Sequence, residues 1–398
     1  MRIRAVSACP AAVVAALIVA VLAAAPDAHA ARGMEVGIQE DGAFLGHWFD
    51  RDKTFVLAHR LSVTRVRVMV QWSKVLGAQA TLRRAPRVPR WDFAQFDTLL
   101  DAADANGMKL QVVLTGPAPA FAAGNHAVGP YKPSARQFAR FVAAAARHFK
   151  GRVDRYSIWN EPNHKAWLAP VASAPRIYRA LYETGYRTIK RIDPSAQVLI
   201  GETVPYDLRG GRTATSPLRF LRAMLCVDSR YRKSRCGHVN ADGYAHHPYE
   251  FTHAPSYRYP GADNVTIGVL GRLTGALDRL RRIGALRGPH GGRMPVYLTE
   301  YGYFATGKRR IGESRRGGYL AKAFAIALAN PRVREMLHYG LVQPPRGNAG
   351  EFFATYLTGR TGRALGAFRG LAAYLTRQAK AGRIAASPTS PAASRRPG

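Results

Sequence analysis

Short apolar segments alternate with amphipathic ones through most of this chain of 398 residues. Met108–Leu114 has the composition of a buried strand, whereas Trp91–Ala105 carries its apolar residues at helical spacing. About eight such strand and helix pairs follow one another, and strands connected in this way form a parallel sheet covered by helices. The pattern predicts the α/β class and a closed (β/α)8 TIM barrel. A doubly wound open sheet is the alternative, but no glycine-rich phosphate loop follows the first strand, Met34–Gln39.

The expected elements can be placed from their composition and spacing. Strands are expected at 34–39, 63–70, 108–114, around Trp159, at 196–201, at 240–245, leading to Glu300, and at 333–342. Helices are expected at 50–61, 91–105, 134–149, 176–192, 217–225, 265–283 and 319–329. Because the strands of such a barrel present their C-terminal ends at one mouth, residues that directly follow the strands are the candidates for a functional site.

The N-terminal 30 residues have the pattern of a secretory signal peptide. Arg2 and Arg4 form a basic start, Ala11–Ala25 is an apolar run, and Ala28–Ala30 is an A-x-A cleavage site. An uncleaved anchor is the alternative, although the apolar run is short for a membrane span. We therefore expect a signal peptide at 1–30 and a secreted protein that is extracellular or held in the cell envelope.

The rest of the chain is expected to form one catalytic domain with a short tail. The barrel is assigned to 31–378, and 379–398 is rich in Ser, Pro, Ala and Arg without periodicity, which is typical of disorder. Cys226 and Cys236 are the two cysteines beyond the signal, and in an exported protein this spacing predicts one disulfide. Two unrelated free thiols are the alternative. No CxxC or HExxH spacing is present, so we expect neither a metal nor a cofactor.

The net charge of +34 has two interpretations. Such a charge attracts nucleic acid, anionic lipid or acidic polysaccharide. However, the arginines are scattered through every segment, which is also what genome composition alone produces. Because an exported protein rarely meets nucleic acid, we expect no nucleic-acid partner. Association with anionic cell-surface polymers stays open, and we expect a monomer.

Two glutamates follow strands that lie far apart in the sequence. Glu161 is in the stretch Tyr156–Asn163, where Pro162 stops the strand, and Glu300 is in Met294–Tyr303. In a barrel both carboxylates reach the same mouth. Paired carboxylates suit glycoside cleavage, because one donates a proton to the leaving oxygen while the other attacks the anomeric carbon or activates water. Helix capping or ion pairing with an arginine is the structural alternative for each glutamate.

Other side chains near strand ends are candidates for substrate binding. Arg67, at the end of the second strand, is placed to keep one carboxylate ionised through a charge-assisted hydrogen bond. The aromatic residues Trp72, Phe121, Trp167 and Tyr303 follow predicted strands, and their faces could stack on sugar rings. Simple covering of loops is the alternative for each of them.

The motifs Ile158–Asn163 and Leu298–Gly302 resemble those of clan A retaining glycoside hydrolases, with families 39 and 5 the most similar. The resemblance extends over about residues 34 to 376 and is confined to motifs. It implies that Glu161 is the general acid/base and Glu300 the nucleophile. It also implies that Asn160 bonds the sugar 2-hydroxyl, a contact that strengthens in the transition state.

The same resemblance implies roles for residues on other strands. Arg67 matches the arginine of the second strand, which steadies the nucleophile in this clan. His247 and Tyr249 resemble the His-x-Tyr pair of the sixth strand, whose tyrosine bonds the nucleophile. The clan usually has a tryptophan after the eighth strand, and here it is missing. Either Tyr339 or Gln343 replaces it, or this part of the sugar site is reshaped.

The sequence thus predicts a secreted retaining glycoside hydrolase that takes part in polysaccharide breakdown. It would cleave O-glycosidic bonds of a poly- or oligosaccharide by double displacement through a glycosyl-enzyme intermediate. Two alternatives use the same fold. One is a transglycosylase that remodels an envelope polysaccharide, and the other is a barrel that binds carbohydrate without cleaving it.

Overall fold

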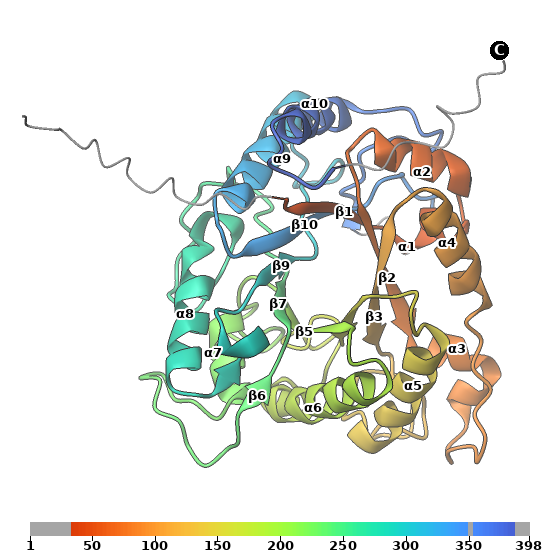
Figure 1. Cartoon of the computed structure of the whole chain (residues 1–398), viewed down its shortest axis with the longest axis vertical. Helices are drawn as coiled ribbons and strands as arrows, with labels where there is room; N and C mark the ends of the chain where they lie inside the picture. The colour runs from red at the N-terminus through yellow and green to blue at the C-terminus, as the bar shows by residue number, and fades with distance from the viewer. Residues whose placement is uncertain (1–32, 349–352, 387–398) are drawn as a thin grey trace, which may run out of the picture.

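The computed structural model describes residues 33–348 and 353–386, and eight parallel strands in it close into a barrel (Figure 1). The strands follow one another around the barrel in the order β1, β10, β9, β7, β5, β4, β3, β2. They are β1 (Glu35–Gln39), β2 (Arg65–Gln71), β3 (Lys109–Thr115), β4 (Arg155–Ile158), β5 (Gln197–Thr203), β7 (Gly243–His246), β9 (Val296–Leu298) and β10 (Val333–Tyr339). Two short strands, β6 (Val239–Asn240) and β8 (Leu286–Arg287), pair with each other outside the barrel. The (β/α)8 prediction is confirmed.

Helices surround the strands on the outside of the barrel (Figure 1). They are α1 (Asp41–Phe44), α2 (Arg51–His59), α3 (Trp72–Leu76), α4 (Ala94–Ala105), α5 (Ala135–His148), α6 (Ala174–Ile192), α7 (Pro217–Met224), α8 (Gly271–Arg282), α9 (Glu313–Leu328) and α10 (Gly366–Lys380). Helix α5 is typical. The Ser134 side chain accepts a hydrogen bond from the backbone N–H of Gln137, and Phe138 and Phe141 are buried. The cap satisfies a free N–H group, and the apolar stripe fixes the helix against the sheet.

The alternation of side chains along β2 divides the core into two parts. Val66, Val68 and Val70 are fully buried in the main apolar cluster between strands and helices. Arg65 and Arg67 point the other way, into the barrel, because successive side chains of a strand face opposite sides. Both arginines are buried, so the barrel interior has charged groups near each end. The charges at the C-terminal end form the candidate site.

Several element bounds differ from those expected. Strand β5 continues to Thr203 instead of stopping at Gly201. Helix α8 begins at Gly271, because 265–270 forms a loop and a short 3-10 turn. Helix α9 begins earlier than expected, at Glu313, and its Gly317 packs against Gly370 of α10, a helix that the pattern did not predict. Glycine in a helix costs stability, but here it permits the two helices to approach closely.

The folded body also extends past residue 378, where the sequence placed its boundary. Helix α10 ends at Lys380, and Ile384 then pairs with Met34 beside the barrel. The predicted signal peptide and residues 387–398 of the predicted tail lie outside the described residues. Within the part that is described, every helix is too short or too polar to cross a membrane. The predicted disulfide between Cys226 and Cys236 is confirmed, and it closes a small loop after α7.

Candidate active site

The two predicted catalytic glutamates meet at the C-terminal mouth of the barrel. Glu161 follows β4, and its backbone N–H donates to the Glu202 carbonyl at 2.9 Å, so the neighbouring strand holds the turn in place. Glu161 has a φ of +40°, a conformation that costs a residue other than glycine some energy and that is concentrated at functional sites. Glu300 follows β9. Oxygen atoms of Glu161 and Glu300 and a ring nitrogen of His247 all lie within 4.8 Å of one another.

Arg67 connects the nucleophile candidate to its neighbours. Its guanidinium is fully buried and donates from Nη1 to Glu300 Oε1 at 2.9 Å and to the side chain of Gln39. From Nη2 it donates to Asn160 Oδ1 and to Glu202 Oε2, each at 3.0 Å. The contact between Arg67 and Glu300 is the one expected from the position of Arg67 on the second strand. An arginine that donates to several acceptors at once fixes their orientation.

Tyr249 holds the second oxygen of Glu300. Its hydroxyl donates to Glu300 Oε2 at 3.0 Å, so the carboxylate is bound on both oxygens. Burial raises the pKa of Glu300, and the positive charges of His247 and Arg67 oppose that rise. The result is a buried carboxylate that is oriented by Arg67 and Tyr249 and faces Glu161.

His247 joins three carboxylates. Its Nδ1 lies 3.1 Å from Glu161 Oε1 and 3.5 Å from Glu300 Oε2, and its Nε2 lies 2.7 Å from Glu202 Oε2. Burial alone would lower the pKa of His247, but the charge of Glu300 and the hydrogen bonds to Glu161 and Glu202 raise it to about 9. At neutral pH the ring is therefore a cation, and both of its nitrogens act as donors.

Glu202 is a buried site residue that the sequence analysis missed. Burial would raise its pKa, but Arg67 and His247 lower it to about 2, and the Thr299 hydroxyl also donates to it. Its φ is +50°. Glu202 directly follows the strand expected at 196–201, yet the sequence analysis did not name it as a candidate. The signal was present, since an acidic residue after an apolar strand is the same pattern that identified Glu161.

Two predicted sugar-stacking residues belong to the core instead. Trp72 is fully buried and stacks on Phe141, with ring centroids 5.9 Å apart. Tyr303 is also fully buried, and its hydroxyl donates to the His253 carbonyl at 2.8 Å. Neither ring has a free face, so these two predictions are corrected. Trp72 packs on helix α5, whereas Tyr303 bonds the backbone of a loop, so the structural alternative of loop covering applies to Tyr303 and not to Trp72.

Trp167 remains a candidate for substrate binding. It is partly exposed and lies on the loop that follows Glu161, where its carbonyl accepts a hydrogen bond from Trp159 Nε1 at 2.9 Å. Phe121 is also partly exposed but packs edge-on against Trp72. A sugar-binding role for Trp167 stays a prediction.

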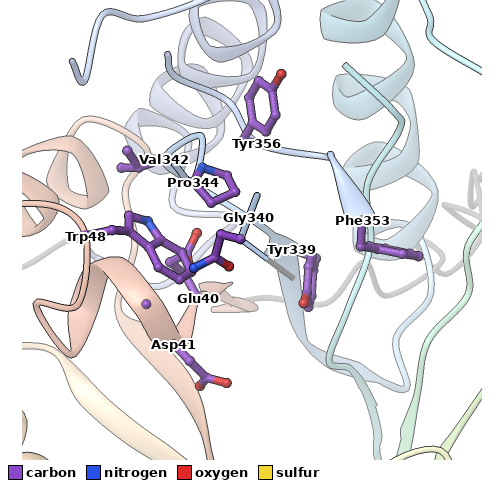
Figure 2. A pocket seen from close by; sticks show the side chains of 11 residues that line it. Glu40, Asp41, Trp48, Tyr339, Gly340, Val342, Pro344, Phe353 and Tyr356 are labelled. Carbon is purple, nitrogen blue, oxygen red and sulfur yellow. The ribbon is translucent and has the colours of Figure 1, made fainter. Parts of the chain in front are cut away.

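A pocket of about 180 Å³ lies at the end of the eighth barrel strand. Figure 2 shows the rings of Trp48, Tyr339 and Phe353 around it, together with the carboxylates of Glu40 and Asp41. Tyr339 lines this pocket, so Tyr339 occupies the region where the clan's tryptophan is missing. Trp48 comes from the loop after α1 and was not predicted, because it follows no predicted strand directly.

Glu161, His247 and Glu300 are also spaced closely enough to share a metal ion. Their electrostatics argue against it: His247 is cationic at neutral pH, and Arg67 already contacts Glu300. Two positive charges at the same place repel a divalent cation. The cluster is therefore suited to proton transfer and to nucleophilic attack by a carboxylate.

No protein-family model matches the chain, and no curated protein matches its sequence. Solved structures do match its fold. A family 39 glycoside hydrolase from the gut symbiont Bacteroides cellulosilyticus WH2 has a TM-score of 0.64 at 20% identity, with 87% of this chain and 64% of that chain covered. A monomeric beta-xylosidase from Caulobacter crescentus CB15 has a TM-score of 0.56 at 18% identity, with 86% and 69% covered. The xylanase 10B of Thermotoga maritima has a TM-score of 0.55 at 16% identity, with 87% and 96% covered.

These similarities place the fold among the barrels of glycoside hydrolases. The resemblance to family 39 glycoside hydrolases that the motifs indicated is confirmed at the level of the fold. The chain spans 64% of the length of the Bacteroides protein, so part of that protein has no counterpart in the aligned region. At such low identity the likeness concerns the fold, and the activity must be argued from the site.

Proposed function

We propose that this protein is a retaining glycoside hydrolase that cleaves O-glycosidic bonds of an oligo- or polysaccharide by double displacement. One observation carries the proposal: oxygens of Glu161 and Glu300, on the fourth and seventh barrel strands, lie within 4.8 Å of each other. Retaining enzymes need carboxyl groups about 5–5.5 Å apart, whereas inverting enzymes need about 6.5–9.5 Å to leave room for a water.

In the first step, Glu161 acts as the general acid and Glu300 as the nucleophile. The carboxyl proton of Glu161 passes to the glycosidic oxygen as the bond between that oxygen and C1 breaks. The carboxylate of Glu300 forms a new bond to C1, and the alcohol leaves. Arg67 and Tyr249 orient Glu300 for this attack, because each binds one of its oxygens.

The second step reverses these roles. A water molecule gives a proton to the Glu161 carboxylate and attacks C1 with its oxygen, and the bond from C1 to Glu300 breaks. Both glutamates return to their starting states, and the product keeps the original anomeric configuration. His247 donates to Glu161 and thereby holds the carboxylate close to C1 in both steps.

Asn160 is placed to bind the reacting sugar. Its Oδ1 accepts a hydrogen bond from Arg67, so its side-chain N–H groups can donate to a substrate. A donor at this position would bond the sugar 2-hydroxyl, as the clan resemblance implies. Such a bond strengthens as charge develops on the sugar ring and so lowers the barrier.

We further propose that the protein is exported. The signal-like pattern at 1–30 supports this, and so does the disulfide between Cys226 and Cys236, because disulfides persist in oxidising compartments. Protein recovered from the culture medium should begin at Ala31. A mature chain that still begins at Met1 and stays in the cytoplasm would contradict export.

The high positive charge supports a weaker proposal, association with anionic cell-surface polymers. Sedimentation with isolated cell envelopes should fall steeply as salt rises, because screened charges no longer attract. Sedimentation that is independent of salt, or absent at low salt, would remove this proposal without affecting the catalytic one.

A substrate screen with matched variants tests the catalytic proposal. Aryl β-glycosides and plant and bacterial polysaccharides are offered to the wild type, to Glu161→Ala, and to Glu183→Ala, a control on the outer helix α6. On substrates with poor leaving groups, Glu161→Ala should lose about 10²–10⁴-fold in rate. On a dinitrophenyl glycoside it should keep its first step, because that leaving group needs no proton. Full activity of Glu161→Ala on every substrate would overturn the assignment.

A further inference from the structure

A groove lies beside the candidate active site, over the ends of β10, β1 and β2. Its first part is the pocket of about 180 Å³ beside Tyr339, Asp41 and Trp48. Its second part has a volume of about 520 Å³ and is lined by Asp41 and Trp48 together with Gln71 and Lys74. Because Asp41 and Trp48 line both parts, the two lie side by side. We call them together the Trp48 groove.

The groove begins next to the nucleophile. The side chain of Gln39 accepts a hydrogen bond from Arg67 and donates one to Asp41 at 3.4 Å, and Arg67 in turn contacts Glu300. Burial raises the pKa of Asp41 to about 6, and the nearby charge of Glu300 adds to that rise. Asp41, on the groove wall, is therefore a close neighbour of the residue that would hold the sugar.

The first part of the groove, at β10, lies across the barrel mouth from the general acid, and the second part, at β2, lies two strands from β4. Strands β4 and β10 are four places apart in either direction around the eight-stranded ring, so they are on opposite sides. Glu161 follows β4 and must protonate the leaving group, which therefore lies on the β4 side. The part of the substrate that stays bonded to Glu300 extends toward β10 and β1. The Trp48 groove thus begins on the non-reducing side of the cleaved bond, at β10, and follows the rim of the barrel to β2.

The walls of the groove have the chemistry that binds sugars. The Trp48 ring packs on Gly42, where a Cβ atom would lie 2.0 Å from a ring carbon, so only glycine permits this position of the ring. An aromatic face held in this way stacks on the C–H face of a pyranose. Gln71, Lys74 and Gln95 line the second part and supply donors and acceptors for hydroxyl groups.

We propose that the Trp48 groove binds further sugar units on the non-reducing side and that the enzyme cleaves bonds inside a chain instead of removing terminal sugars. The proposal rests on the proposed hydrolase function and adds its substrate class, a polysaccharide or longer oligosaccharide. An enzyme that removes single terminal sugars needs a wall behind the reacting unit. Here the pocket behind that unit adjoins the larger part of the groove at Asp41 and Trp48.

The test compares 4-nitrophenyl β-glycosides of one, two and three sugar units, in the xylose and the glucose series. With the wild type, kcat/KM should rise at least about tenfold from one unit to three, because each added unit gains contacts in the groove. Trp48→Ala should reduce the ratio of the three-unit to the one-unit value by about tenfold. The matched control Trp91→Ala, a tryptophan outside the groove that packs on Phe141, should leave that ratio as in the wild type.

The outcomes separate this inference from the proposed function. A one-unit glycoside that is the best substrate, or a ratio that Trp48→Ala leaves unchanged, would overturn the inference while hydrolysis stands. If no glycoside is cleaved, binding of xylotriose and cellotriose is measured by calorimetry with the wild type and Trp48→Ala. Binding that depends on Trp48 would support the sugar-binding role of the groove and contradict the proposed hydrolase function. Absence of binding would contradict both proposals.

Discussion

Strand β2 gives one arginine to each end of the barrel, and the two ends use it differently. At the N-terminal end, Arg65 and Arg155 pair with Glu35, Asp154 and Glu335. At the C-terminal end, Arg67 and His247 pair with Glu161, Glu202 and Glu300. We call these the lower cluster and the upper cluster. Each one combines two cationic side chains with three carboxylates.

The difference lies in one histidine and one loosely held carboxylate. In the lower cluster both cations are arginines, which stay protonated at any working pH, and each carboxylate has an arginine partner. In the upper cluster one cation is a histidine. Within the described chain, the Glu161 side chain bonds to His247 alone, whereas each carboxylate of the lower cluster bonds to at least one arginine. A cluster whose carboxylates are all paired with arginine stabilises the barrel, whereas one with a carboxylate held only by a titratable partner can move protons.

The largest expected effect compares one glutamate from each cluster. Glu300→Gln should lower kcat/KM by about 10⁴-fold or more, because an amide cannot form the glycosyl intermediate. The control Glu335→Gln removes a carboxylate of the lower cluster and should leave kcat/KM of the folded protein within about twofold, since it touches no reacting atom. Initial rates and thermal melts of both variants provide the comparison. Equal loss of activity in both would mean that the clusters do not differ in function.

The arginines provide the second comparison. Arg155→Met leaves Glu335 without its arginine partner and removes one of the two arginines that pair with Glu35, so it should destabilise the protein by about 3–5 kcal/mol. The measurement is urea unfolding followed by circular dichroism. Arg67→Met should in addition abolish most activity, because Glu300 loses a donor. If Arg155→Met also lost activity while still folded, the lower cluster would have a role in the chemistry.

The fall of kcat/KM at alkaline pH should come from the upper cluster. The pKa of His247 is raised to about 9, so its contribution to stability is complete below its unfolded pKa and is lost as pH rises through 9. The value of kcat/KM should fall over the same range, because a neutral ring no longer donates to both Glu161 and Glu202. Glu202→Gln should move this fall to lower pH, since Glu202 helps to raise the pKa of His247. A profile that stays flat to pH 10 in both proteins would contradict the positioning role of Glu202.

The smallest effect on activity is expected far from both clusters. Cys226→Ser with Cys236→Ser opens the small loop after α7 and should lower the free energy of unfolding by about 2–3 kcal/mol, as expected for a loop of this length. The kcat/KM value should stay as in the wild type. Thermal melts and initial rates measure both quantities. A large loss of activity in a folded double variant would connect the loop to the cleft.

The sequence predicts the barrel and the catalytic pair because both depend on local patterns. The spacing of apolar residues identifies buried strands and amphipathic helices, and Glu161 stands out because Pro162 ends its strand. Glu202 was missed although it directly follows an expected strand, because the residue after it is Thr203 and not a proline that marks the strand end, as Pro162 does for Glu161. Trp72 was misassigned because its position after a strand does not reveal that Phe141 covers its face. Trp48 depends on a loop and on Gly42, and loop conformation follows from contacts that are distant in the sequence.

The most direct test of the account is to trap the intermediate on its nucleophile. A 2-deoxy-2-fluoro glycoside with a good leaving group slows the second step, so the glycosyl enzyme accumulates and its peptides can be read by mass spectrometry. The account predicts that the added mass lies on the peptide that carries Glu300 and that the product of normal turnover keeps its anomeric configuration. A label on Glu202, or an inverted product without any label, would contradict it.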